Sequence, residues 1–408
     1  MISKLIKKDN YDLHVYKTDK FKTIEIHIVL SHDKTPKQYV ADSFRDLLLL
    51  TSKYYKNKRE RFIKQEELYN LSLSIRNRSY GRMDSFDYCM NMINPKLVND
   101  DYTEEAIKFC FDIVNNPVFD NSKLKKMKDE LRYWSNLAKE NPTACAEFKA
   151  YDLFFDDPID KPQFILEDEV IDSLTMEQIQ DYYKELISNS KVDIFLLGDV
   201  DDKYIEYIDK YNVFKSVNKT LEYQIEVNTR DEVKVVTETR KDLNQAQIYM
   251  MFNIPKMNYE DFLKMAMYGD ILGKGGLTSR LYKKVREEEK LCYNIGIYNK
   301  IDTSSFTIST SVDNKNIDKT IQSINECIDG MQEISDEEID NEKAYLLPTF
   351  ENVFDDLRRI FLFDYRELLL NESSYEKSKE IVNAITKEDV LSMNGNLKLN
   401  CIYILKGE

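Results

Sequence analysis

The sequence predicts an α+β protein built from two similar halves, and three observations support this. A chain of 408 residues is too long for one ordinary hydrophobic core, so two or more domains are expected. Segments with the alternation of strands and segments with the periodicity of helices both occur along it. A capped helix followed by a buried strand occurs twice, about 210 residues apart. We interpret this repeat as an internal duplication.

The first half opens with strands. From Ile24 to Leu30 apolar residues occupy every second position, which predicts a half-buried strand. The elements expected up to residue 93 are two strands within 11–32, helices over 38–54 and 68–73, and strands within 80–93 that break near Gly81.

Helices dominate the rest of the first half. The expected helices cover residues 104–114, 122–139 and 143–155, the first being ended by Asn115, Asn116 and Pro117. Thr175 then begins a further helix, with Gln178 placed to complete a capping box. A short buried strand follows at 192–197.

The second half ends in the same way. Residues 382–388 parallel 171–177, and residues 401–405 parallel the strand at 193–197. We place the connection between the halves near residues 216–231, which gives one domain over 1–218 and a second over 219–408.

Composition excludes several classes of function. The formal net charge of −15 argues against a sequence-independent nucleic-acid binder, and the basic run at 53–61 is typical of a solvated helix end. The six cysteines have no CxxC spacing, which indicates reduced thiols in a cytoplasmic protein. No signal-peptide core opens the chain, and no stretch approaches about 18 apolar residues. We therefore expect neither nucleic acid nor a membrane as a partner.

Residues 271–293 hold the strongest motif. Gly273, Gly275 and Gly276 let backbone approach backbone, and Thr278 or Ser279 is placed to cap the helix that follows. Arg286 lies about two turns into that helix, and Tyr293 begins a strand behind it. One interpretation places a guanidinium and a phenol on one side of a cleft, where they bind a peptide carbonyl or carboxylate. The alternative is a surface Arg286 in an ion pair and a half-buried Tyr293.

This stretch resembles the C-terminal-half signature of the insulinase/pitrilysin metallopeptidases, which include mitochondrial processing peptidase. The matching residues are Ser279, Arg280, Leu281, Arg286, Glu287, Leu291 and Tyr293. Residues 116–120, 157–171, 197–200 and 245–255 resemble further elements of that family in the correct order. The departures are Lys274, which interrupts the glycines, and Cys292, which replaces a small residue.

The resemblance has structural and functional implications. It implies a processing-peptidase-like fold, in which each half is a mainly antiparallel sheet covered by helices. It also implies that Arg286 and Tyr293 contact the substrate backbone from the half opposite the metal.

The zinc motif of the family is missing. Active members carry His-x-x-Glu-His on the first long helix, because zinc needs imidazole or carboxylate donors and a Glu to take a proton from the bound water. At the corresponding positions this sequence has Ser43, Asp46 and Leu47. We therefore expect no catalytic residue and no metal ligand in this chain.

The three histidines do not replace that motif. His14 and His27 lie on expected strands, and His32 lies in the turn after the second of them. They have no HxH or HxxxH spacing, so we interpret them as ordinary strand and loop histidines. No histidine follows His32, no Gly-x-Ser-x-Gly is present, and the glycines at 273–276 do not form a P-loop.

Within the resemblance, some two-subunit peptidases keep the zinc helix on one chain and the Arg/Tyr pair on the other. This sequence has the second pattern, which implies a catalytically silent, substrate-positioning subunit of a heterodimeric zinc peptidase acting on peptides or precursor peptides. Zinc is then expected in a zinc-bearing paralogous subunit, and no cofactor in this chain. Similar bacterial proteins are associated with elongation factor P modification or with peptide precursor processing, and the sequence does not separate these.

Two alternatives remain open at this point. One is a peptide-binding or scaffold protein with no proteolytic role, built as a homodimer on the same fold. The other is an enzyme that acts alone by an unknown chemistry.

Overall fold

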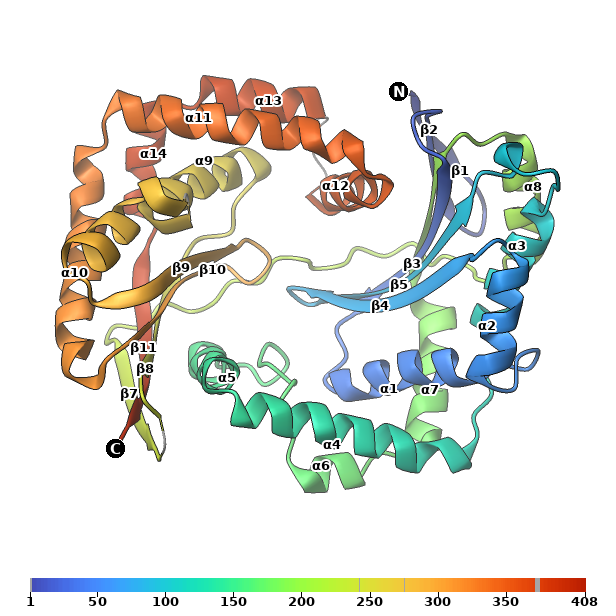
Figure 1. Ribbon diagram of the computed structural model, residues 1–408, viewed down its shortest axis with the longest axis horizontal. Coiled ribbons are helices and arrows are strands. Elements are labelled where there is room, and N and C mark those ends of the chain that lie inside the picture. The colour runs from blue at the N-terminus through green and yellow to red at the C-terminus, as the bar shows by residue number, and fades with distance from the viewer. Residues whose placement is uncertain (1, 242, 275, 371–374) are drawn as a thin grey trace. The chain divides into compact units, whose positions relative to one another are not determined.

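The computed structural model describes residues 2–241, 243–274, 276–370 and 375–408, which fold into two compact units (Figure 1). Unit 1 comprises Met1–Ser135, Leu166–Glu222 and Asp356–Leu362, and unit 2 comprises Asn136–Ile165, Tyr223–Asp355 and Phe363–Glu408. Each unit has one β-sheet and several helices, so the predicted α+β class with two similar halves is confirmed.

Unit 1 is built on a six-stranded sheet in the order β1-β2-β6-β3-β5-β4. Only β2 and β6 are parallel neighbours among these strands, so the sheet is mainly antiparallel. The strands are β1 (Ile2–Lys7), β2 (Asp12–Lys17), β3 (Thr23–Asp33), β4 (Ser72–Tyr80), β5 (Met83–Ile93) and β6 (Lys191–Gly198). The helices are α1 (Gln38–Leu50), α2 (Lys58–Glu67), α3 (Thr103–Val114), α4 (Leu124–Glu140), α6 (Asp168–Asp172), α7 (Met176–Asn189) and α8 (Asp202–Tyr211), with α4 ending in unit 2.

Unit 2 is built on a five-stranded sheet in the order β7-β11-β8-β10-β9. Its strands are β7 (Lys234–Arg240), β8 (Ala246–Asn253), β9 (Cys292–Lys300), β10 (Ser305–Val312) and β11 (Lys398–Gly407). Its helices are α5 (Pro142–Phe154), α9 (Tyr259–Gly269), α10 (Ile317–Asp329), α11 (Asp336–Glu351), α12 (Leu357–Leu370), α13 (Tyr375–Ala384) and α14 (Lys387–Asn394), with α12 beginning in unit 1.

Both sheets have the same internal arrangement, which supports the duplication. In the first, β6 lies between β2 and β3; in the second, β11 lies between β7 and β8. The two inserted strands each follow a helix that begins with a capping box. Thr175 and Gln178 form the first box, with bonds of 3.2 and 2.9 Å, and Thr386 and Asp389 form the second, with the same distances.

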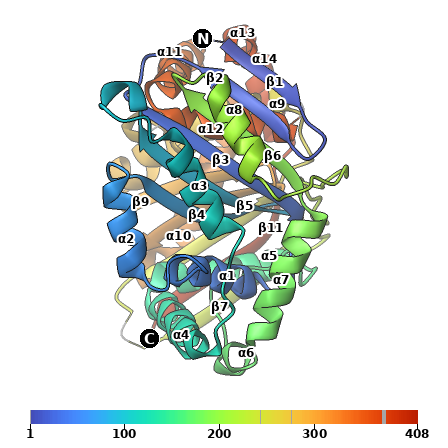
Figure 2. The same cartoon turned by 90° about the vertical axis from the view of Figure 1, so that its right-hand side faces the viewer.

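Helices cover one face of the first sheet, and Figure 2 shows α1, α3, α7 and α8 in front of its strands. Alternate residues of β3, from Ile24 to Leu30, pack in this core with Phe44 and Leu47 of α1. The other face of β3 is also buried, because Phe361 at the start of α12 lies over His27. The prediction of a half-buried strand is therefore wrong, and the covering residue comes from a distant part of the sequence.

Three further expectations need correction. The helix expected over 68–73 is absent, since α2 ends at Glu67, Tyr69 and Asn70 have positive φ angles of 57° and 58°, and β4 begins at Ser72. His32 lies within β3 rather than in a turn. The helix expected over 38–54 ends at Leu50.

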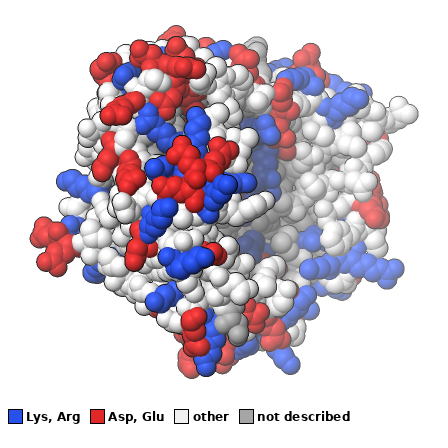
Figure 3. Space-filling model, turned by 60° about the vertical axis from the view of Figure 1, so that its left-hand side comes forward, with Lys and Arg blue, Asp and Glu red and all other residues white. Residues whose placement is uncertain are grey.

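Two surface features bear on partners. None of the helices in the described ranges is both long and apolar enough to span a bilayer. On the face drawn in Figure 3, Lys and Arg side chains stand among Asp and Glu side chains, so the negative net charge does not form one continuous acidic surface there.

Candidate functional site

The motif at 271–293 has an unusual backbone. After α9 the chain passes through a π-helical turn, η3 (Asp270–Lys274), a short 3-10 turn at Gly276–Thr278, and a π-helix, η5 (Tyr282–Glu288), before β9. Loop, helix and strand thus occur in the predicted order, and the helix is of the π type. π-Helices are rare and are frequent at functional sites.

Two of the three motif glycines have clear roles, and Gly275 lies outside the described residues. A Cβ atom on Gly273 would lie 2.7 Å from Cδ1 of Ile297 and 2.8 Å from Cδ1 of Leu281, so any side chain there would force these two buried side chains to shift. Gly276 has a φ of +67°, a conformation that favours glycine.

The Ser279 hydroxyl donates to the Gly276 carbonyl at 2.8 Å and so closes the glycine turn. Leu281, the residue before η5, makes no side-chain capping bond. The cap expected from Thr278 or Ser279 therefore stays a prediction.

The structure brings Arg286 and Tyr293 together. The Arg286 guanidinium carbon lies 4.8 Å from the centroid of the Tyr293 ring and 4.5 Å from that of the Tyr282 ring. Both distances are in the range of cation–π contacts. Both rings contact the guanidinium of Arg286. Its N–H donors all lie in one plane.

The pair is available to a ligand. Tyr293 is 79% exposed, so it is not a half-buried core residue. Among the described residues, no carboxylate forms an ion pair with Arg286. The site rests on the core of unit 2, since Leu281, just before η5, and Val285 within it are both fully buried. This geometry suits binding of a carbonyl or carboxylate group by the guanidinium.

Helix α1 does not have the donors of a zinc site. The Ser43 hydroxyl is buried and donates to the Tyr39 carbonyl at 2.8 Å. Asp46 pairs with Arg45 at 3.0 Å, and Leu47 is fully buried in the core. One carboxylate that already has a cationic partner, without an imidazole nearby on the helix, does not fit the zinc of an active metallopeptidase.

Two of the histidines have structural partners. In His14, Nε2 lies 2.9 Å from Oδ1 of Asp193. In His32, Nδ1 donates to the Asp33 carbonyl at 2.8 Å, so Nε2 is left to accept from the Tyr182 hydroxyl at 3.2 Å. Burial lowers the pKa of His32, which favours the neutral ring that these bonds require.

Comparison with known proteins agrees with the motif. Residues 173–346 match the family described as the peptidase M16 inactive domain, and this stretch contains both Arg286 and Tyr293. The "Probable inactive metalloprotease YmfF" of Bacillus subtilis is 23% identical and aligns with 97% of this chain and 95% of its own length. The chain is an M16 peptidase homologue. The resemblance to the insulinase/pitrilysin metallopeptidases is thus confirmed.

Solved structures agree on the fold of this M16 homologue. A conserved protein from Enterococcus faecalis superposes with a TM-score of 0.91 at 21% identity, over 100% of this chain and 99% of that one. A peptidase M16 inactive domain from Pseudomonas fluorescens gives 0.81 at 15% identity, over 100% and 98% of the two chains.

Arg280 holds the motif of the M16 homologue in place, a role that sequence reasoning missed. Its Nε donates to Oε1 of Glu338 at 2.8 Å and its Nη2 to Oε2 at 2.9 Å, a bidentate pair. It also donates to the carbonyl groups of Gly330 and Glu333. Burial alone would raise the pKa of Glu338. The hydrogen bonds that Glu338 accepts from Arg280 and Ser335 outweigh this effect and lower its pKa to about 2. The partners lie more than one element away, so spacing gave no signal for them.

A second missed contact joins η3 to α11. Asp270 and Glu342 are buried acids that lie within hydrogen-bond reach, and Lys274 is 3.8 Å from Asp270. Burial and the nearby Asp270 raise the pKa of Glu342 to about 7, and burial raises the pKa of Asp270. Glu342 therefore keeps its proton to a higher pH than an exposed glutamate does.

We expect Glu342→Gln to stabilise the protein in a pH-dependent way. The pKa of Glu342 is raised in the folded state. At low pH Glu342 is protonated in both the folded and the unfolded protein, so its ionisation does not affect stability. As the pH rises from about 4.5 to about 7, Glu342 ionises more readily in the unfolded protein, so the free energy of unfolding falls. After a discount for partial solvent screening, the variant should gain about 1–2 kcal/mol near pH 8 and nothing near pH 4. Thermal unfolding at the two pH values measures this. An equal gain at both would show that ionisation of Glu342 is not the cause.

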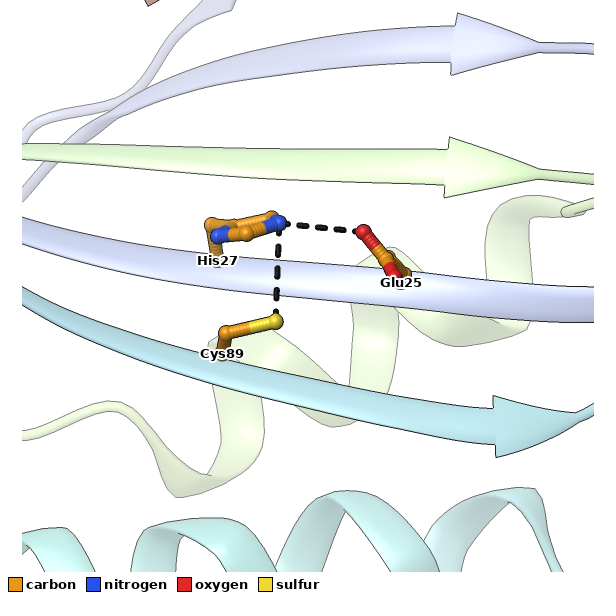
Figure 4. Close-up of side chains that lie close together, drawn as sticks. All are labelled: Glu25, His27 and Cys89. Carbon is orange, nitrogen blue, oxygen red and sulfur yellow. Dashed lines mark hydrogen bonds and ion pairs between the residues drawn. The ribbon is translucent and has the colours of Figure 1, made fainter. Parts of the chain in front are cut away.

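A third missed cluster lies in unit 1 (Figure 4). Nε2 of His27 is 3.2 Å from Oε2 of Glu25 and 3.6 Å from Sγ of Cys89. The spacing of Glu25 and His27 places both on one face of β3, a signal that the sequence contained. Cys89 could not be added from the sequence, because it joins them only through the register that pairs it with His27.

Proposed function

We propose that this chain is the catalytically silent, substrate-positioning subunit of a heterodimeric zinc peptidase that acts on peptides or precursor peptides. The observation that carries the proposal is the half-buried Arg286, within cation–π distance of Tyr282 and of the exposed Tyr293, in a chain whose α1 lacks zinc donors. In this function the partner is a zinc-bearing paralogue, and both subunits act in the cytoplasm.

Arg286 and Tyr293 would act on the peptide backbone. A guanidinium offers paired N–H donors in one plane, which match the oxygen atoms of a carbonyl or carboxylate group. The rings of Tyr282 and Tyr293 restrict that plane before a peptide arrives, so less side-chain entropy is lost on binding. The Tyr293 hydroxyl supplies one further donor. Together they align a peptide bond for attack by groups that this chain does not contain.

Hydrolysis would depend on the partner. Ser43, Asp46 and Leu47 do not fit a catalytic zinc ion, so we assign no chemical step to α1. Relatives of both kinds occur in one organism, which supports a division of labour. Bacillus subtilis has the probable inactive metalloprotease YmfF and also an "Uncharacterized zinc protease YmxG", which is 20% identical to this chain over 73% of its length.

Sedimentation of the chain with and without a zinc-bearing M16 paralogue from the same organism tests the assembly. We expect the mixture to form a 1:1 heterodimer at the expense of any self-association. A stable homodimer that ignores the paralogue and binds peptides would support the alternative, a peptide-binding scaffold with no proteolytic role.

A further inference from the structure

One face of β3 and β5 in unit 1 holds a cluster of buried and half-buried polar side chains. Glu25 and His27 project from β3, while Asp87, Cys89 and Asn91 project from the same face of β5. Glu25 is 8% exposed, His27 is 1% exposed and Asp87 is 1% exposed. Burial of ionisable groups is costly unless they contact one another, so the contacts among these side chains show what the cluster can bind.

The donor atoms converge at distances that suit a tetrahedral cation. The ligand atoms of Glu25, His27 and Cys89 all lie within 4.8 Å of one another. In a tetrahedral zinc site with bonds of about 2.0–2.3 Å, neighbouring donor atoms lie roughly 3.3–3.6 Å apart. Nε2 of His27 lies 3.2 Å from the Glu25 oxygen and 3.6 Å from the Cys89 sulfur (Figure 4).

The surroundings orient these donors as the second shell of a metal site does. Nδ1 of His27 donates to Oδ1 of Asp87 at 3.0 Å, which turns Nε2 toward Glu25 and Cys89. A metal-bound histidine almost always donates its other N–H in this way. Nδ2 of Asn91 donates to Oε1 of Glu25 at 2.8 Å, which leaves Oε2 facing the imidazole.

An aromatic ring covers the histidine of the cluster. The Phe361 ring stacks on the His27 ring with centroids 3.6 Å apart, and Phe361 also contacts Phe195. This apolar cover lowers the local dielectric on the side of His27, while Cys89 is only half-buried.

We propose that Glu25, His27 and Cys89 bind one zinc ion in unit 1, with water as the fourth ligand, at a site separate from the Arg286 motif. The mixture of nitrogen, sulfur and oxygen donors selects zinc over magnesium or calcium, which prefer oxygen alone. Zinc replaces the Cys89 thiol proton and the proton on Nε2 of His27, and both protons leave to solvent. The site gains two positive charges and loses two, so its net charge does not change.

The ion would tie β3 to β5 where they are direct neighbours. His27 pairs with Cys89 across these strands, and the Glu25 ligand lies two residues along β3. The proposal does not rest on the proposed function, because it concerns residues outside the motif and needs no partner subunit.

Zinc content of the full chain tests the proposal. The protein is stripped with a chelator, reloaded with Zn²⁺ and dialysed, and zinc per chain is measured by mass spectrometry. We expect one zinc per chain in the wild type and in Cys145→Ser, a matched control at a half-buried cysteine of unit 2, and none in Cys89→Ser. Asp87→Asn keeps all three ligands and should weaken zinc binding by about 10–100-fold.

Cobalt loading gives a readout that a structural defect alone would not move. The wild type and Cys145→Ser should show the absorption of a thiolate bound to Co²⁺, and Cys89→Ser should lack it while keeping its circular dichroism spectrum. If Cys89→Ser does not fold, X-ray absorption of the zinc-loaded wild type should show one sulfur neighbour with nitrogen and oxygen. A wild type that retains no zinc, or zinc with no sulfur neighbour, would overturn the proposal and leave a buried ion pair between His27 and its two carboxylates.

Discussion

Replacing Arg286 with alanine should reduce peptide cleavage by the reconstituted complex by about 1–3 kcal/mol of transition-state binding, or roughly 5- to 150-fold in kcat/KM. The reason is geometric: alanine removes both the paired donors and the cation that Tyr282 and Tyr293 restrict. Arg286→Lys keeps the charge but loses the planar fork, so it should recover little activity. Tyr293→Phe keeps the ring contact and loses one hydroxyl, so its effect should be at the lower end of the range.

Lys283→Ala is the matched control for Arg286. Lys283 is an exposed cation on the same π-helix, three residues earlier. It should leave kcat/KM unchanged, and all four variants should melt within about 2 °C of the wild type because exposed and half-buried polar substitutions rarely affect folding. Full activity in both Arg286→Ala and Tyr293→Phe would show that these side chains do not position the substrate.

Arg280→Ala should destabilise unit 2 by about 2–3 kcal/mol, the second large effect that we expect. The substitution removes the bidentate pair with Glu338 and the two bonds to the Gly330 and Glu333 carbonyls, and it leaves these acceptors without their donor. The pair is only partly buried, so the figure lies below that for a fully buried ion pair. Urea unfolding measures it.

The effect of Arg280→Ala should also depend on pH. The folded-state pKa of Glu338 lies below its usual value, so the stabilisation is complete above about pH 4.5 and is lost as the pH falls toward about 2. The difference between Arg280→Ala and the wild type should therefore shrink over this range, while Lys283→Ala stays close to the wild type throughout. A difference that is independent of pH would assign the loss to packing rather than to the ion pair.

Local features of the fold could be predicted from the sequence. The capping box of Thr175 and Gln178 depends on residues three apart, so both partners were visible in the sequence. The alternation in β3 gave the strand correctly for the same reason. The helix expected over 68–73 failed because Tyr69 and Asn70 take left-handed conformations, which no glycine signalled.

Contacts between distant segments could not be predicted. Helix α5 comes from the first half of the sequence, yet it packs in unit 2, where Ala146 and Phe154 share a core with Tyr249 of β8. Likewise Phe361 covers His27, although nothing near either residue indicates the other.

Only those residues of the site that belong to the sequence motif could be predicted. Arg286 and Tyr293 are seven residues apart in a recognisable pattern, whereas the partners of Arg280 depend on how α11 packs. The grouping of Glu25, His27 and Cys89 depends on the register between β3 and β5, which the sequence of either strand leaves open.

Peptide cleavage by three samples tests the central claim most directly: this chain alone, the zinc-bearing paralogue alone, and the two mixed in equal amounts. We predict strong, chelator-sensitive cleavage in the mixture, little with the paralogue alone, and none with this chain alone, even after it is loaded with zinc. Chelator-sensitive cleavage by this chain alone, at a rate that the paralogue does not increase, would contradict the claim.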